Sequence, residues 1–246
     1  MKQILLITDG CSNVGDSPVM AAAHAFQEGI SVNVIGVVDY GTIGELGGRE
    51  IEDIAKAGGG LSRIVGSPQL AQTMQMMTRK TVVQTIQVAV NKEVQKILGE
   101  GSIEDLPPAK RSQVVTVVDD LSEKAPLRLA LLIDASASMK PKLAAVEEAI
   151  RDLALSLEAR EGVSEIAVFH FPGTGEEPAV MDMDWSRNVT GIRSLFGKIR
   201  MKGTTPTGPA IFRVLDHFRY DTLDEHQGRL AAYAEEGEGM PGGYVV

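Results

Sequence analysis

Three short segments of this chain end an apolar strand or a loop with oxygen-bearing side chains. The segments are ILLITDG (4–10), LLIDASASM (131–139) and GTTPTGPAI (203–211). Short apolar, β-branched runs of this kind are typical of strands that are buried on both faces of a parallel sheet, and open α/β sheets bind ligands at the carboxyl ends of such strands. The segments therefore predict an α/β fold with a polar site at one edge of its sheet. The oxygen side chains that they offer are Asp9, Asp134, Ser136, Ser138 and Thr205.

The first part of the chain alternates strand and helix patterns. Strands are predicted at Ile4–Ile7, Ser31–Val38 and 61–65, and helices at Pro18–Glu28 and around Glu50–Ala57. A proline near the start of the first helix and a glycine just past its end are the expected asymmetry of helix termini. The β-α-β-α-β order predicts a mostly parallel central sheet that is flanked by helices.

The middle of the chain is predicted to be helical. Apolar residues at mixed three- and four-residue spacing run from Leu70 to Leu98, which indicates either one long helix or two shorter ones. Residues 99–125 contain glycines, a Pro-Pro pair and charged runs around VVTVV (114–118). We expect only one short helix there.

Strand patterns begin again at Leu127. Strands are predicted at Leu127–Ile133, Glu165–Phe171 and Ala179–Met183, and helices at Leu143–Ala159, near Val189–Ile199 and at Gly208–Phe218. Residues 221–246 are acidic and contain several glycines, which predicts a flexible tail.

Composition excludes several classes of partner and site. The net charge of −9 argues against nucleic acid or an anionic membrane as a partner, because such binding needs a basic face. Cys11 is the single cysteine, so an internal disulfide framework and a Cys-based zinc site are excluded. The apolar run at 4–7 is too short for a signal-peptide core, and no stretch approaches about 18 apolar residues. We therefore expect a cytoplasmic protein.

The oxygen residues suit a hard divalent cation. Mg²⁺ prefers six oxygen ligands, and two serines at positions i and i+2 after a strand can direct both hydroxyls to one point. With few anionic ligands the ion stays electrophilic, so a carboxylate of another molecule can complete its shell. Alternatively, Asp and Ser after a strand cap the next helix, and Thr-Pro-Thr-Gly is a simple turn. The joint occurrence of three such motifs favours the metal site.

These motifs resemble the metal-ion-dependent adhesion site (MIDAS) of von Willebrand factor A (VWA) domains. In that family D-x-S-x-S comes first, a threonine loop second and a strand-ending Asp third, whereas here the third element comes first. The chain also resembles VWA-type proteins of spore-forming Firmicutes, which implies a Rossmann-like VWA fold that is circularly permuted. This resemblance runs through ILLITDGCSN (4–13), SVNVIGVV (31–38), LPPAKR (106–111), SASMKPKL (136–143) and TPTGPA (205–210).

The permutation implies four parts. Residues 1–66 would be the C-terminal half of the VWA fold, 67–126 a helical connector insertion, 127–220 the N-terminal half and 221–246 an acidic flexible tail. Compact α/β domains tolerate permutation because their termini lie at the surface and often close together. The connector is longer than chain closure requires, so we expect it to form a helical appendage.

The resemblance also implies a role for each site residue. Ser136, Ser138 and Thr205 would bind Mg²⁺ or Mn²⁺ directly, while Asp134 and Asp9 would act mostly through water. Thr204 is a neighbouring alternative, although the T-x-T-G spacing of the family favours Thr205. The function implied is binding, without catalysis, of a protein partner with an exposed Asp or Glu, in a role connected with sporulation. The chain is expected to be a monomer or a swapped dimer.

Two other functions stay open. Asp134 beside Mg²⁺ could be the nucleophile of a phosphoryl-transfer enzyme, but the phosphatase pattern needs a second Asp where Ser136 stands. Asp182 and Asp184 form a D-x-D string without a paired downstream motif. The remaining possibility is a scaffold in which the metal only stabilises the fold.

Basic residues flank the predicted metal site, and the four histidines show no metal-ligand spacing. The basic residues are Lys140, Lys142, Arg193, Lys198, Arg200 and Lys202. On an acidic protein they either steer an acidic partner toward the ion or form an ordinary solvated helix face.

Overall fold

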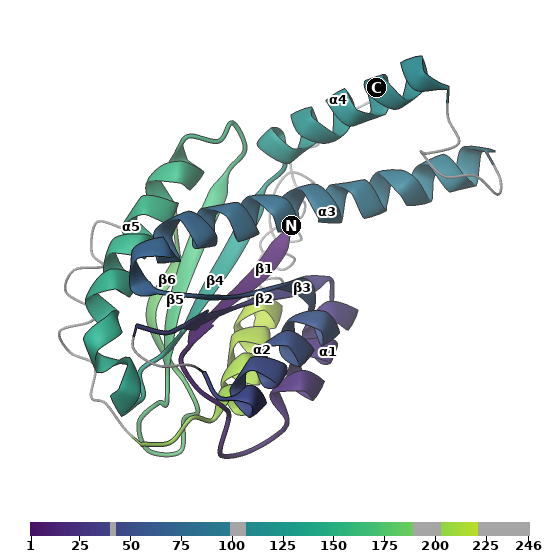
Figure 1. Ribbon diagram of the computed structural model, residues 1–246. Coiled ribbons are helices and arrows are strands. Elements are labelled where there is room, and N and C mark those ends of the chain that lie inside the picture. Colours follow the sequence, from purple (N-terminus) through teal and green to yellow (C-terminus); the bar gives the residue numbers. More distant parts are fainter. Residues whose placement is uncertain (40–42, 99–106, 189–202, 221–246) are drawn as a thin grey trace, which may run out of the picture.

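A computed structural model describes residues 1–39, 43–98, 107–188 and 203–220. Its centre is a six-stranded sheet with the order β3-β2-β1-β4-β5-β6 (Figure 1). The strands are β1 (Lys2–Thr8), β2 (Ile30–Val37), β3 (Gly59–Val65), β4 (Leu127–Asp134), β5 (Ser164–Phe171) and β6 (Val180–Ser186). All neighbouring strands pair in parallel except β6, which is antiparallel to β5. The predicted α/β class and mostly parallel sheet are confirmed.

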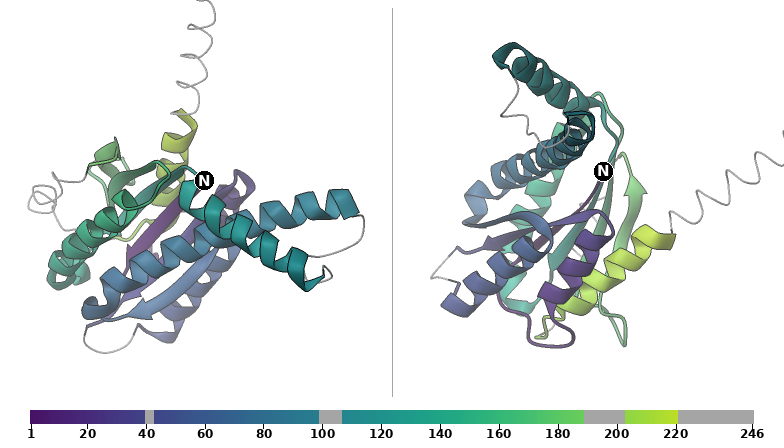
Figure 2. Two further views of the ribbon diagram at one scale, coloured as in Figure 1. Left: turned by 90° about the horizontal axis from the view of Figure 1, so that it is seen from above. Right: turned by 90° about the vertical axis from the view of Figure 1, so that its right-hand side faces the viewer.

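Helices cover both faces of the sheet (Figure 2). They are α1 (Pro18–Gln27), α2 (Glu45–Ala57), α3 (Leu70–Leu98), α4 (Pro108–Lys124), α5 (Leu143–Glu158) and a helix at 207–220. Alternate residues of β1 enter different cores: Leu5 and Ile7 pack toward α3 and α5, whereas Ile4 and Leu6 pack toward α1, α2 and 207–220. Burial on both faces explains why the strands are almost continuously apolar.

Segments from both ends of the chain share this sheet. β1 lies between β2 and β4, with Lys2 opposite Arg128 and Ile7 opposite Ile133. The parallel register brings the carboxyl ends of β1 and β4 to the same edge of the sheet. Residues that follow these two strands are therefore neighbours, although more than a hundred positions separate them in the sequence.

The middle of the chain forms two helices that project from one side of the sheet (Figures 1 and 2). α3 is one continuous helix, which settles the choice between one helix and two. The expectation of only a short helix after it was wrong, because α4 includes the whole VVTVV run. Val carries only a small helix penalty, Pro108 at the first turn suits a helix start, and Val118 is buried in the core that α3 joins.

Helix α2 starts earlier than predicted. The helix was predicted around Glu50–Ala57, yet α2 begins at Glu45 and includes Gly47 and Gly48. A Cβ at Gly47 would lie 2.6 Å from Ile43 Cγ2, so the missing side chain allows this helix to approach the preceding loop. Glycine here serves close packing and does not mark a break.

Three sequence predictions lie outside the described residues: the helix near Val189–Ile199, the four flanking basic residues at positions 193, 198, 200 and 202, and the tail 221–246. Among the residues that the structure describes, no helix is long and apolar enough to cross a membrane.

Candidate metal centre

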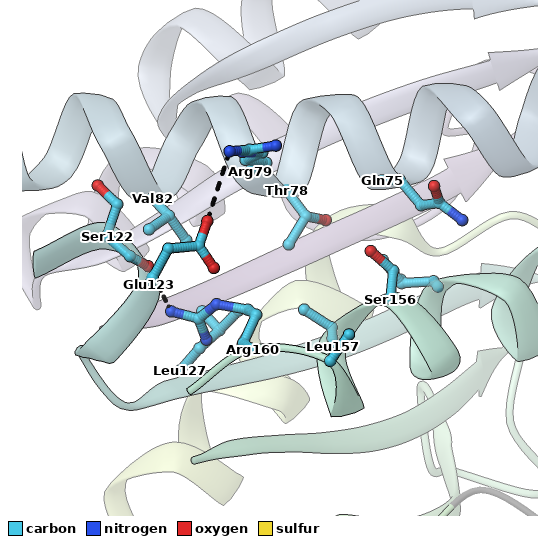
Figure 3. Close-up of a pocket in the computed structure, with 12 residues that line it drawn as sticks. Gln75, Thr78, Arg79, Val82, Ser122, Glu123, Leu127, Ser156, Leu157 and Arg160 are labelled. Atoms are coloured by element: carbon cyan, nitrogen blue, oxygen red, sulfur yellow. Dashed lines mark hydrogen bonds and ion pairs between the residues drawn. The ribbon is translucent and has the colours of Figure 1, made fainter. Parts of the chain in front are cut away.

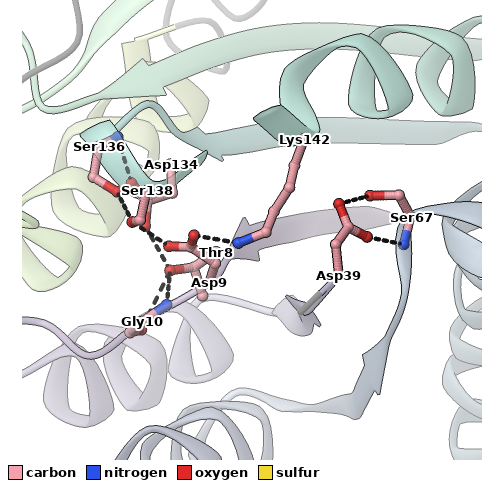
Figure 4. A network of polar contacts seen from close by, with 9 residues as sticks. All are labelled: Thr8, Asp9, Gly10, Asp39, Ser67, Asp134, Ser136, Ser138 and Lys142. Atoms are coloured by element: carbon pink, nitrogen blue, oxygen red, sulfur yellow. Dashed lines mark hydrogen bonds and ion pairs between the residues drawn. The ribbon is translucent and has the colours of Figure 1, made fainter. Parts of the chain in front are cut away.

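The candidate site is built on the carboxyl ends of β1 and β4. Asp134, the last residue of β4, is fully buried. Its Oδ2 accepts a hydrogen bond of 2.7 Å from Thr8 Oγ1 at the end of β1, and its Oδ1 accepts one of 2.8 Å from the backbone N–H of Ser136 (Figure 4). The two strands therefore hold this carboxylate in one orientation.

The surroundings of Asp134 make its negative charge costly. Burial raises the pKa of this carboxyl, and the hydrogen bonds from Thr8 and Ser136 oppose that rise without cancelling it. The nearby carboxylate of Asp9 raises the pKa of Asp134 further. A buried carboxylate in this state is stabilised by either a proton or a cation.

Two serine hydroxyls extend the network to Asp9. Ser136 Oγ lies 3.1 Å from Ser138 Oγ, and Ser138 Oγ donates to Asp9 Oδ1 over 2.8 Å (Figure 4). The 3₁₀ helix η3 (Ala137–Lys142) begins directly after Ser136 and buries Met139 completely, which fixes the orientation of this turn. Four of the five predicted ligands are thus joined by one chain of hydrogen bonds, in which the backbone N–H of Ser136 provides the link to Asp134.

A lysine occupies the remaining oxygen of Asp9. Lys142 Nζ lies 2.5 Å from Asp9 Oδ2, and both side chains are largely shielded from solvent. The sequence had offered Lys142 only as one of several flanking basic residues. In the structure it is part of the site itself.

Thr205, the fifth predicted ligand, is hydrogen-bonded through its backbone to the loop that follows Asp9 and makes no hydrogen bond to the other four among the described contacts. Its backbone N–H donates to Asn13 Oδ1 over 2.8 Å, and its carbonyl accepts from Asn13 N and Ser12 Oγ, each at 3.2 Å. Gly208 permits this contact between loops, because a Cβ there would lie 2.0 Å from the carbonyl oxygen of Asp16. The threonine loop is therefore held against the loop that carries Asp9.

Sequence reasoning missed Thr8 and Asn13, which orient the predicted ligands. Thr8 precedes Asp9 directly, so its place at the strand end was a usable signal. Asn13 gave no such signal, because its partner Thr205 is 192 positions away. Glu50 of α2 was also missed; it accepts the backbone N–H of Ser12 over 2.7 Å and supports the same loop.

The donor set fits a hard divalent cation. It consists of carboxylate and hydroxyl oxygens, the ligands that Mg²⁺ and Mn²⁺ prefer. Within the described residues, no group of three or more His, Cys, Asp or Glu side chains gathers to hold a metal. Any metal at this edge of the sheet would consequently depend on Ser136, Ser138 and Thr205 as much as on Asp9 and Asp134.

Asp182 and Asp184, the D-x-D alternative, are engaged separately by two histidines. Asp182 Oδ2 lies 2.6 Å from His170 Nδ1 of β5, whereas Asp184 Oδ1 lies 2.9 Å from His217 Nε2 of the helix at 207–220. The His217 ring also stacks on Trp185, with 5.5 Å between ring centroids. These contacts tie β6 to its neighbours and give both carboxylates a structural partner.

Cys11 is a free and exposed cysteine in the loop after Asp9. Partial burial and, to a smaller degree, the carboxylate of Glu50 raise the pKa of its thiol. A thiol with a raised pKa is a poorer nucleophile at neutral pH, because less of it is ionised.

A separate cavity of about 150 Å³ lies between α3, α4 and α5 (Figure 3). It is found near Leu127, at the beginning of β4, and so at the other end of this strand from Asp134. Several of the polar groups that line it are hydrogen-bonded to one another or to nearby backbone: Arg160 donates to the carbonyls of Ser122 and Ala125 over 2.7 and 2.9 Å. The cavity is thus not part of the candidate metal centre.

Comparison with known proteins gives two close relatives. No protein-family model matches the chain. The uncharacterized protein YabS of Bacillus subtilis (strain 168) is 44% identical over 232 residues, which are 94% of each of the two proteins. A crystal structure of an uncharacterized protein from Alicyclobacillus acidocaldarius subsp. acidocaldarius DSM 446 is 45% identical, with a TM-score of 0.85, and the match covers 91% of this chain and 96% of that one.

A more distant match is proximal thread matrix protein 1 from the mussel byssus, whose structure has a zinc-occupied MIDAS motif. It is 17% identical with a TM-score of 0.25, over 83% of this chain and 43% of that chain. At this TM-score the likeness supports no conclusion about this chain.

Proposed function

The chain belongs to the family of Bacillus subtilis YabS, and we propose that it is a circularly permuted VWA domain that binds a protein partner through a divalent cation. The observation that carries the proposal is the hydrogen-bonded network of Asp9, Asp134, Ser136 and Ser138. Its members come from two strands that are distant in sequence. They lie at the sheet edge where α/β folds bind ligands.

The proposed ligands divide into neutral and anionic groups. Ser136, Ser138 and Thr205 would hold Mg²⁺ or Mn²⁺ directly, while Asp134 and Asp9 would act through water. A bound ion with this shell supplies an incompletely neutralised position, to which an Asp or Glu carboxylate of a partner protein can bind. Thr8 and Ser136 N–H keep the Asp134 carboxylate oriented for this role.

The order of the strands supports the permutation. β1 carries the strand-ending Asp9 and opens the chain, yet it pairs directly with β4, which carries the D-x-S-x-S motif. In the VWA order these two strands would be reversed, with 127–220 before 1–66. α3 and α4 then serve as the connector that joins the two halves.

The position of Asp134 favours binding over phosphoryl transfer. A nucleophile must be reached by its substrate, whereas this carboxylate is fully buried and both of its oxygens accept hydrogen bonds. We also propose a cytoplasmic location, in line with the free Cys11, and a role in sporulation. A strain that lacks the gene and forms heat-resistant spores at the normal frequency would contradict the sporulation role.

Metal-dependent capture of a partner tests the proposal. The wild-type chain and Asp134→Asn are immobilised and exposed to host extract, once with Mg²⁺ and once with EDTA. Asp53→Asn on the exposed surface of α2 is the matched control, because it removes a carboxylate that is not part of the network. We expect one partner that the wild type and the control retain only with Mg²⁺ and that Asp134→Asn does not retain.

The proposal also requires a carboxylate on the partner. Replacing its key Asp or Glu by Asn or Gln should abolish capture. Retention that is equal in Mg²⁺ and EDTA, or equal for wild type and Asp134→Asn, would contradict the proposed function. In that case the site would hold either a metal that only stabilises the fold or no metal at all.

A further inference from the structure

The ion pair of Lys142 is less exposed to solvent than those of Lys96 and Lys124. The side chains of Lys142 and Asp9 are only 12% and 4% exposed, whereas those of Lys124 and its partner Asp120 are 53% and 54% exposed. An ion pair that is shielded from water is screened less than a surface pair, and removing one partner leaves the other charge buried and uncompensated. Lys142 is the last residue of η3 and lies directly before α5 (Figure 4).

The contact places a positive charge on a proposed metal-site carboxylate. Asp9 uses one oxygen for Ser138 and the other for Lys142, so both of its oxygens are occupied. A divalent cation beside Ser138 would lie close to the Lys142 ammonium. Like charges at such short range repel strongly where water is partly excluded.

We propose that Lys142 is an internal cation that competes with the divalent ion for Asp9 and thereby sets the metal concentration at which the site fills. This inference rests on the proposed function, since it concerns the same site. Lys142 would weaken the affinity of the site for the metal, so the site would fill only when the divalent ion is abundant.

The carboxylate of Asp39 is a second negative charge that interacts with Lys142. Asp39 follows β2 and accepts hydrogen bonds of 2.8 Å from both the N–H and the hydroxyl of Ser67 (Figure 4). These bonds lower the pKa of Asp39, and the charge of Lys142 lowers it further, so the two side chains already attract each other. The proposal therefore includes Asp39 as the second negative charge near the Lys142 ammonium once a metal ion replaces that ammonium at Asp9.

The direction in which Lys142→Met changes the metal affinity distinguishes competition from simple support of the fold. If Lys142 only holds Asp9 in place, Lys142→Met should weaken metal binding or leave it unchanged. If Lys142 competes, the same variant should bind metal more tightly. Lys142→Arg keeps the charge and should stay close to the wild type.

Calorimetric titration with Mg²⁺ and Mn²⁺ measures this change directly. The proteins are the wild type, Lys142→Met, Lys142→Arg and Asp134→Asn, with Lys140→Met as the matched control because Lys140 is an exposed lysine of the same turn. We expect Lys142→Met to bind Mn²⁺ about tenfold or more tightly, which corresponds to at least about 1.4 kcal/mol. Lys140→Met should stay within about threefold of the wild type, since exposed charges contribute little.

A second readout needs no metal. In EDTA, Lys142→Met should lower the thermal midpoint, because Asp9 loses the cation that neutralises it, and Mn²⁺ should restore that midpoint more fully than in the wild type. Equal or weaker Mn²⁺ affinity in Lys142→Met, with affinity lost in Asp134→Asn, would overturn the competition and leave the metal site intact. Absence of binding in the wild type and in Lys142→Met alike would overturn the proposed function.

Discussion

Removing one hydroxyl at the end of β1 tests how the site is held together. Thr8 is buried and donates to Asp134 Oδ2 over 2.7 Å, and valine has nearly the same shape without the hydroxyl. A hydrogen bond to a charged group contributes about 1.5 to 3 kcal/mol, so Thr8→Val should lower the free energy of unfolding by that amount at pH 7 without metal. For a domain of this size the thermal midpoint should fall by ~3 to 12 °C.

The loss should depend on pH in a defined direction. The pKa of Asp134 is raised in the folded state, so its contribution to stability is fully present below its ordinary pKa and is lost as the pH rises through the raised one. Thr8 favours the charged carboxylate and limits this loss. The difference between Thr8→Val and the wild type should therefore be small at acidic pH and should grow as the pH rises.

Thr78→Val is the matched control. Thr78 is also buried, but its hydroxyl has no hydrogen-bond partner within the described structure. Its replacement by valine should be neutral or slightly stabilising, because a buried unpaired hydroxyl costs free energy. Urea unfolding in EDTA across the pH range measures both variants. If Thr8→Val destabilises no more than Thr78→Val, or if its effect shrinks with rising pH, the reasoning is wrong.

Three further predictions follow from the same contacts. Asn13→Ala should lower the free energy of unfolding by about 0.5 to 1.5 kcal/mol and weaken Mn²⁺ binding, because it releases the loop of Thr205; unchanged calorimetry and urea curves would contradict this. Fragments 1–98 and 126–220 should each be poorly folded and regain circular dichroism when mixed, since β1 pairs with β4; separate cooperative transitions would refute one shared fold. Cys11 should react with a disulfide reagent at pH 7 more slowly than a free thiol, given its raised pKa; faster reaction would show that the local field has the opposite sign.

Much of the fold could be predicted because burial shapes the sequence. The strands at Ile4–Ile7 and Leu127–Ile133 are apolar on both faces, and a sheet that is covered by helices requires this. The helix around VVTVV was predicted to be short, whereas α4 spans Pro108–Lys124, because the helix penalty of its valines is small enough for packing to override.

The candidate site could be predicted only in part. Asp9, Asp134, Ser136 and Ser138 lie at or just after the ends of strands, and parallel pairing brings these ends together. The position of Lys142 could not be predicted, since Lys140 and Lys142 are equivalent in the sequence and only the 3₁₀ turn decides which one faces Asp9.

The most direct test of the proposed metal site is a crystal structure with Mn²⁺, using its anomalous scattering to locate the ion. We predict one strong anomalous peak at the carboxyl ends of β1 and β4, within bonding distance of the hydroxyls of Ser136, Ser138 and Thr205. Crystals of Asp134→Asn that are prepared in the same way should lack this anomalous peak. A wild-type map without a peak at this edge, or with Mn²⁺ bound only elsewhere, would contradict the account.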